Sequence, residues 1–187
     1  MYVFNKAVYD CHLTEDDVFS DEILSIKGEK FKEFIDLCSS HAAFFSLTRA
    51  PWTQSTDANL EMELQPHLIT TLKCTKWFCY HVTEKNMLEI SIYRATSESI
   101  EIILQHLSDL FVDEHHGACP HEPRPTLEDL CFFGTEKLFM GTVSHEYICH
   151  VFPPDKDFEQ ALPQFGKWSW HEDVINDQIF LADYIKL

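Results

Sequence analysis

Histidine and cysteine residues are concentrated in one short segment of the sequence. His115, His116, Cys119 and His121 fall in a stretch, residues 113–126, that also contains three prolines and a glycine. Imidazole and thiolate are ligands that zinc prefers, and a proline-rich loop could present several of them together. These four residues are therefore candidate zinc ligands. The alternative is a solvated histidine-rich loop, because one short tract fixes no second pair of ligands.

A second group is the run HEYICH at residues 145–150. Zinc hydrolases place two histidine ligands one helical turn apart, at positions i and i+4 of a helix. In this run Cys149 occupies i+4 and the second histidine, His150, falls at i+5. The flanking Gly-Thr-Val and Val-Phe-Pro segments favour strands. The sequence therefore predicts a strand here rather than a metal-binding helix.

A thiol or hydroxyl nucleophile is a third hypothesis. The candidates are Ser144, Cys79, Cys131 and Cys149, each of which would need a histidine and a carboxylate nearby. Because the chain has 7 cysteines and 11 histidines, many pairs of a nucleophile and a histidine are possible, and the spacing in the sequence favours none of them. The 5 glycines are scattered and build no phosphate-binding loop, which excludes Rossmann and P-loop nucleotide sites.

Two tryptophans near the end of the chain, Trp168 and Trp170, stand beside Glu172 and Asp173. In an extended segment both indole rings share one face, and an exposed pair of this kind suits binding to a partner protein. These four residues are candidate partner-binding residues. The alternative is that the tryptophans cover the core, because large aromatic side chains are mostly buried.

The chain is acidic along its whole length. Its 187 residues include 31 acidic and 14 basic ones, a net charge of −17, and each third carries an excess of acids. Such a surface repels phosphate backbones and anionic membranes and attracts basic proteins or cations. Direct binding to nucleic acid or membrane is therefore disfavoured. We expect a basic protein partner, the alternative being that the acidity serves solubility alone.

The N-terminal residues and the cysteines indicate a compartment. The first residues lack a basic region followed by an apolar run, and no stretch approaches about 18 consecutive apolar residues. The odd number of cysteines at irregular spacing differs from the disulfide framework of small secreted domains. We therefore expect a cytoplasmic protein with reduced thiols and no structural disulfide.

Hydrophobic periodicity predicts two principal helices, at residues 29–40 and 97–111, the second capped by Thr96 or Ser97. Their apolar stripes should all be buried against one sheet, through Phe31, Phe34, Ile35, Ile100, Ile103, Leu104 and Leu107.

A period of two predicts strands at 43–47, 77–82, 88–93, 130–133, 138–143 and 147–152. We expect residues 84–86 to close a hairpin between 77–82 and 88–93, and residues 144–146 to form a turn. Segments 49–59 and 113–126 are predicted loops. Residues 1–187 are thus expected to form a single α+β domain, a mainly antiparallel sheet with two principal helices packed on one face.

The order of Trp77-Phe78-Cys79-Tyr80, the run LEDLCFF at 127–133 and Ser144-His145-Glu146 resembles a group of small bacterial cytoplasmic proteins of unassigned function. The resemblance covers roughly residues 28–153 and carries no catalytic motif. It is compatible with the small acidic immunity proteins that neutralise toxins.

Together these observations predict a non-enzymatic acidic protein-binding domain without a cofactor, of the immunity or inhibitor type, that acts on a basic partner. The alternative hypothesis is a zinc-dependent hydrolase, or a zinc-stabilised domain, that uses the Cys/His loop 115–121.

Overall fold

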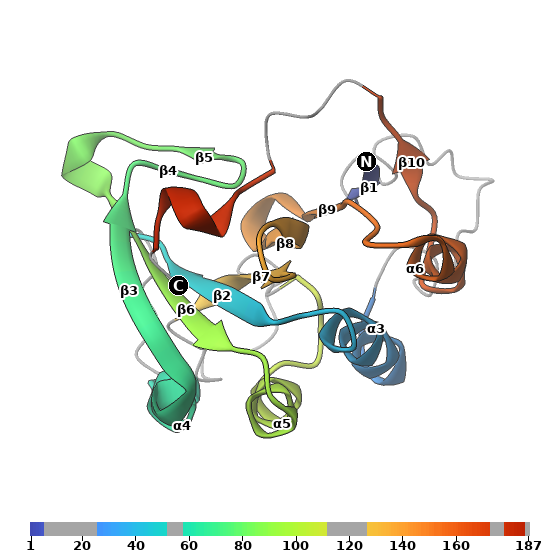
Figure 1. The fold of residues 1–187 in the computed structure, drawn as a ribbon, viewed down its shortest axis with the longest axis horizontal. Coiled ribbons are helices and arrows are strands. Elements are labelled where there is room, and N and C mark those ends of the chain that lie inside the picture. The colour runs from blue at the N-terminus through green and yellow to red at the C-terminus, as the bar shows by residue number, and fades with distance from the viewer. Residues whose placement is uncertain (6–25, 52–57, 112–126, 173–177, 186–187) are drawn as a thin grey trace, which may run out of the picture.

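Antiparallel pairing joins eight strands into one twisted sheet. The computed structural model describes residues 1–5, 26–51, 58–111, 127–172 and 178–185, and in these ranges the strand order is β10-β1-β9-β8-β7-β2-β6-β3 (Figure 1). The strands are β1 (Tyr2–Asn5), β2 (Phe44–Arg49), β3 (Leu68–Cys74), β6 (Leu88–Arg94), β7 (Glu128–Phe133), β8 (Leu138–Val143), β9 (Ile148–Val151) and β10 (Ser169–Trp170). The predicted α+β class with a mainly antiparallel sheet is confirmed.

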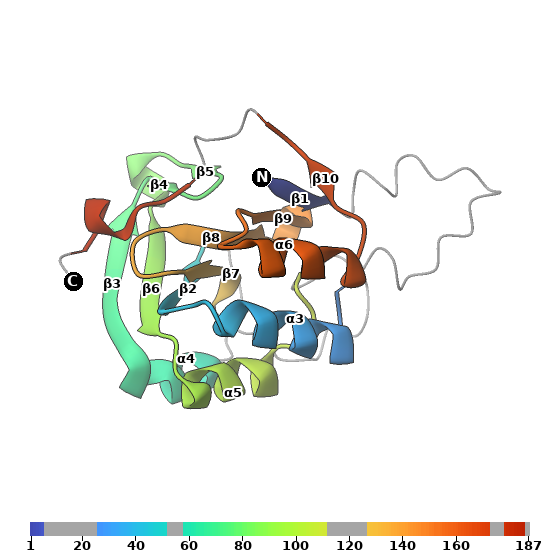
Figure 2. The same cartoon turned by 45° about the vertical axis from the view of Figure 1, so that its right-hand side comes forward.

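The helices lie in a row along one face of this sheet (Figures 1 and 2). In the described ranges they are α3 (Glu29–Ser39), α4 (Asn59–Leu64), α5 (Ser97–His106) and α6 (Lys156–Ala161). Their buried side chains, among them Phe34, Leu60, Ile103 and Phe158, form one continuous apolar core with Phe132 of the sheet. The two predicted helices are therefore confirmed, and two short ones accompany them. None of these helices is long and apolar enough to cross a bilayer.

Helix α5 is shorter than predicted. Thr96 caps it, because its hydroxyl accepts from the Ser99 N–H (3.2 Å) while the Thr96 N–H donates to the Ser99 hydroxyl (2.9 Å). The helix ends at His106, and Leu107 is extended. The predicted stripe is buried except for Leu104, which stays partly exposed.

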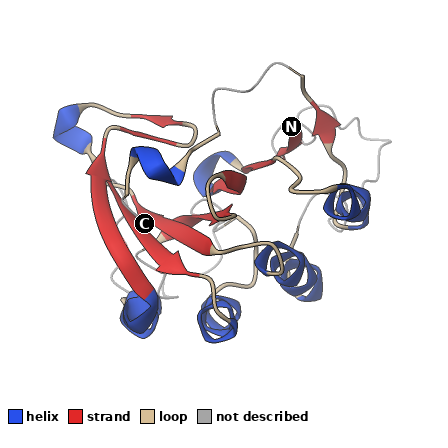
Figure 3. Cartoon of the chain, in the orientation of Figure 1, coloured by secondary structure: helices blue, strands red, loops and turns tan. Residues whose placement is uncertain are grey.

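In the described ranges, the opposite face of the sheet is covered by short segments rather than by α-helices. A two-stranded hairpin, β4 (Lys76–Trp77) and β5 (Tyr80–His81), lies over it together with a C-terminal 3-10 turn, Leu181–Asp183 (Figure 3). Trp77, Ile90, Phe133 and Leu181 belong to a second apolar core between these segments and the sheet. The central strands β7 and β8 are thus buried on both faces.

The predicted pairing of 77–82 with 88–93 is wrong. Instead, β6 lies between β2 and β3, and residues 76–81 fold back on themselves, Trp77 pairing with Tyr80. The segment between them forms a 3-10 turn, Glu84–Asn86. Strand β3 pairs with β6 from Leu68 to Cys74. It was not predicted, because its inward-facing residues are only partly buried and alternate with exposed ones.

The predicted meander is confirmed in β7, β8 and β9, which pair consecutively. The turn between β8 and β9 is a 3-10 turn, Ser144–Glu146. The predicted strand 43–47 corresponds to β2, which extends to Arg49.

Candidate functional site

The candidate zinc ligands His115, His116, Cys119 and His121 lie outside the described residues, as does Asp173. The zinc hypothesis therefore stays a prediction. Residues 145–150 enter strand β9 from the 3-10 turn and do not form the α-helix that the zinc-hydrolase motif needs, as predicted. In the described part of the chain, no three His, Cys, Asp or Glu side chains are arranged to hold a metal ion.

A buried polar cluster lies where the β4–β5 hairpin meets the sheet. It begins at a β-bulge in β7. Cys131 pairs with Ser46 and Glu128 with Thr48, so β7 has one more residue than β2 between these two pairs. Asp129, the residue inside the bulge, has φ 55°, a conformation that aspartate tolerates better than most residues. Both Glu128 and Asp129 are buried.

Asp129 is held from two sides. The Tyr80 hydroxyl donates to one carboxylate oxygen (2.5 Å), and the backbone N–H of Ser144 donates to the other (2.7 Å). His145 Nδ1 lies 3.2 Å from the Tyr80 hydroxyl oxygen. A buried carboxylate is costly unless it accepts hydrogen bonds, so these donors offset the cost of burying Asp129. The cluster therefore ties the hairpin to β7 and to the turn at 144–146.

Electrostatics keep the cluster's phenol and thiol neutral. Burial raises the pKa of Tyr80 far above its ordinary value, and the carboxylates of Asp129 and Glu128 raise it further. Burial likewise raises the pKa of Cys131 to about 12, with a smaller contribution from Asp129. Tyr80 is therefore a permanent hydrogen-bond donor at physiological pH rather than a base, and Cys131 is not a nucleophile.

Beside this cluster, the structure brings one of the predicted nucleophiles to a histidine. Cys79 Sγ lies 3.8 Å from His150 Nδ1, and both residues are only partly buried. Cys149 is fully buried, and burial raises its pKa well above the ordinary value. Ser144 is buried as well. Of the four predicted nucleophiles, Cys79 alone therefore combines partial exposure with this contact to an imidazole.

The predicted partner-binding residues separate. Trp168 packs on the core against Phe4 and Phe34, and its indole N–H donates to the Leu162 carbonyl (2.9 Å). Trp170 is 56% exposed on strand β10, and Glu172 is exposed beyond it. Core cover therefore describes Trp168, and a role in partner binding stays a prediction for Trp170 and Glu172.

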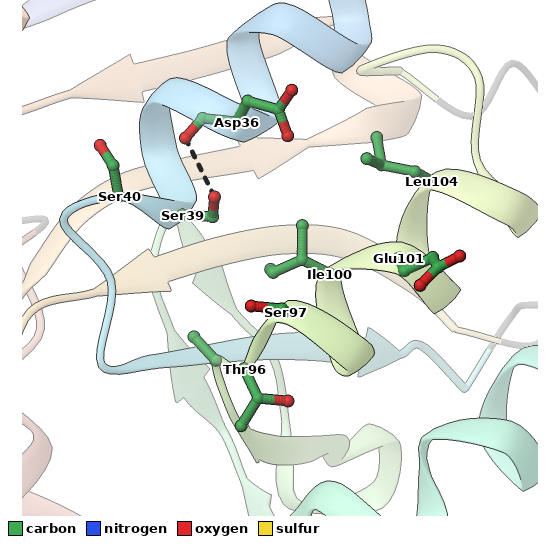
Figure 4. Close-up of a pocket in the computed structure, with 9 residues that line it drawn as sticks. Asp36, Ser39, Ser40, Thr96, Ser97, Ile100, Glu101 and Leu104 are labelled. Carbon is green, nitrogen blue, oxygen red and sulfur yellow. Dashed lines mark hydrogen bonds between the residues drawn. The ribbon is translucent and has the colours of Figure 1, made fainter.

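A groove of about 670 Å³ runs between α3 and α5 (Figure 4). Ile100 and Leu104 of α5 point into the space between the two helices, and the carboxylate of Asp36 reaches toward it from α3. Glu101 lines the outer side of α5, and hydroxyl groups complete the wall through Ser39, Ser40, Thr96 and Ser97. Among the described residues that line the groove, none is basic. The groove thus combines apolar side chains with two carboxylates.

Sequence reasoning missed both the groove and the Tyr80–Asp129 contact. The contact joins residues 49 positions apart, and the groove is formed by helices from different parts of the chain. The sequence does contain one sign of a buried polar cluster: the LEDLCFF run places two carboxylates directly before a wholly apolar strand segment.

No protein-family model, curated protein or solved structure matches this chain. The resemblance to immunity-type proteins therefore stays a prediction.

Proposed function

We propose that this protein binds a basic protein partner and that the groove between α3 and α5 receives a cationic amphipathic segment of that partner. The observation that carries the proposal is the lining of the groove, in which Asp36 and Glu101 flank Ile100 and Leu104 with no basic side chain among them. The net charge of −17 supports it, because a negative surface attracts cationic proteins.

The groove suits a helix better than an extended peptide. An amphipathic helix buries its apolar face in a groove through side chains one turn apart. Leu104 is partly exposed and offers an apolar surface above the largely buried Ile100, one turn away, and lysine or arginine side chains at the edges of such a helix would reach Asp36 and Glu101. The apolar contact would then set the lifetime of the complex, and the carboxylates would favour a cationic partner over a neutral one.

In its more specific form, the proposal is that the protein is an immunity or inhibitor protein. A toxin such as a nuclease needs a cationic surface for its anionic substrate, and an acidic protein docked there would exclude that substrate. The size and charge of the chain are compatible with this role.

The test compares the wild-type protein with the double variant D36K/E101K. The control is E84K/E136K, which makes the same change in net charge at exposed positions outside the groove. Each protein is used as bait in its native host, and a partner that binds the wild type and the control but not the groove variant is then studied by stopped-flow association kinetics. Raising the ionic strength from about 0.01 to 1 M shortens the screening length from roughly 30 to 3 Å and should slow association markedly, with less effect on dissociation.

Two results would reject the proposal. One is a partner that binds D36K/E101K as tightly as the wild type, because the groove would then be irrelevant. The other is an association rate that does not change with salt, because the acidic surface would then contribute nothing to recognition. The immunity form additionally requires that binding inhibits the partner's activity.

A further inference from the structure

The tip of the β4–β5 hairpin carries Cys79 and holds it against the sheet. The hairpin turn is the dipeptide Phe78-Cys79, with Trp77 and Tyr80 paired on either side. The Sγ atom of Cys79 lies 3.8 Å from Nδ1 of His150, which belongs to β9. A thiol and an imidazole that are 71 residues apart in sequence are thus brought into contact by the docking of the hairpin on the sheet.

The position of this pair is fixed by a close contact at Gly141. The Phe78 ring packs edge to face on the His150 ring, with centroids 5.3 Å apart. Gly141 is the direct β8 partner of His150, and a Cβ atom built on it would lie 3.0 Å from two carbons of the Phe78 ring. Because residue 141 has no side chain, the Phe78 ring can pack there and place the turn over His150. The hydrogen bond from Tyr80 to Asp129 holds the other end of the turn.

The other cysteines in the described ranges lie in different surroundings. Cys38, Cys131 and Cys149 are fully buried, and burial raises the pKa of each. Cys74 is partly exposed, but burial raises the pKa of its thiol too. The thiolate is the reactive form of cysteine, and a neighbouring imidazole favours it by taking up the proton. Cys79 is thus the cysteine among these whose surroundings favour reaction, and Cys74 is its natural internal comparison.

We propose that Cys79 is a reactive thiol activated by His150 and that hydroperoxides oxidise it to a sulfenic acid. His150 accepts the thiol proton, and the thiolate sulfur attacks one oxygen of the peroxide. A sulfur–oxygen bond forms, the oxygen–oxygen bond breaks, and the departing oxygen takes the proton back from His150. With hydrogen peroxide the products are Cys79 sulfenic acid and water: the sulfur is oxidised and the peroxide is reduced. The reaction needs only a partly exposed thiol and a proton carrier, and the hairpin tip supplies both.

The first test measures alkylation of the full-length native protein by iodoacetamide at pH 7, followed by peptide mass analysis. Because the imidazole of His150 can take up the thiol proton, we expect the thiolate fraction of Cys79 to exceed that of a thiol without such a neighbour on the order of tenfold. Cys79 should therefore react about tenfold faster than Cys74. In urea, where the contact with His150 is lost, the two rates should converge. Equal rates in the native protein would overturn the proposal, whatever happens in the variants.

The second test uses H150F, which keeps an aromatic ring for Phe78 to pack on and removes the proton acceptor. The alkylation rate of Cys79 should fall to that of Cys74, whereas C74S should leave the Cys79 rate unchanged. After exposure to hydrogen peroxide and then dimedone, the wild type should carry the sulfenic acid adduct on Cys79 and H150F should lack it. A Cys79 rate unaffected in a folded H150F protein would overturn the role of His150. The absence of an adduct on Cys79 of the wild type would overturn the oxidation.

Discussion

Replacing Tyr80 by phenylalanine tests whether the polar cluster stabilises the fold. The change removes one hydroxyl group and keeps the ring that packs in the second core. Asp129 is 1% exposed, so water cannot readily replace the lost donor. Of the two hydrogen bonds to Asp129 described above, only the one from the Ser144 N–H would remain.

The expected cost follows from the charge and burial of this acceptor. A hydrogen bond to a charged group contributes about 1.5 to 3 kcal/mol, and a buried acceptor left without its donor costs about 1 to 3 kcal/mol. Both ranges estimate the free energy lost when this one hydrogen bond is removed, so they are not added. We therefore expect Y80F to lower the free energy of unfolding by about 2 to 3 kcal/mol.

Urea denaturation measures this directly, through a lower midpoint with an unchanged m-value. The matched control is Y184F, because the Tyr184 ring packs edge to face on Trp77 and its hydroxyl makes no hydrogen bond to any other described residue. That substitution should cost less than about 0.5 kcal/mol. A cycle with D129N adds specificity, since asparagine suits the φ of 55° at this position and the coupling with Y80F should be about 1 to 3 kcal/mol. If Y80F costs no more than Y184F, the cluster does not stabilise the fold.

Three further substitutions test the packing and the thiols. G141A should cost about 1 to 3 kcal/mol, because the added methyl group would overlap the phenylalanine ring at the hairpin tip, whereas G134A, where the nearest atom is 4.0 Å away, should be nearly neutral in thermal denaturation. I103A should cost about 2 to 5 kcal/mol and L104A distinctly less in the same assay, because Ile103 is fully buried and Leu104 is not; equal losses would contradict the groove geometry. Burial raises the pKa of Cys131 from 9.0 to about 12, so its contribution to stability is complete below pH 9 and is lost as the pH rises toward 12. Urea titrations on both sides of pH 9 should show a shallower alkaline loss of stability in C131A than in the wild type.

Local patterns predicted the elements whose partners are close in sequence. The stripe of α3 and the meander β7–β8–β9 each follow from apolar spacing over a few residues, and both are found. Strand β3 was missed because it lies at the edge of the sheet and its two faces differ little in polarity, since Ile69 is exposed and Thr70 faces inward. Its amphipathic signal is therefore weak.

The hairpin at 76–81 was mistaken for one strand for a different reason. Its turn places Phe78 at φ 47°, a conformation for which tight turns usually select glycine or asparagine. No turn residue marks the reversal, so the segment WFCYH has the composition of a continuous strand. The candidate site depends on this reversal, because the turn brings Cys79 to His150 and Tyr80 to Asp129. Contacts between positions so far apart follow from the strand order, which no local pattern contains.

The place of β1 in the sheet has a consequence for synthesis. Tyr2 pairs with Val151 on one side and Trp170 on the other, partners that leave the ribosome about 150 residues or more after it. At about 5 to 20 residues per second, β1 waits roughly 7 to 30 s for the first of them. The pairings of β2 with β6 and of β3 with β6 need only residues up to Arg94 and can form well before that, so β1 is incorporated after strands that follow it in the chain. During this interval β1 has no partner strand of its own chain and can pair with another chain, and slower folding through such long-range contacts extends the interval further. The yield of folded protein should therefore fall as the concentration of nascent chains rises.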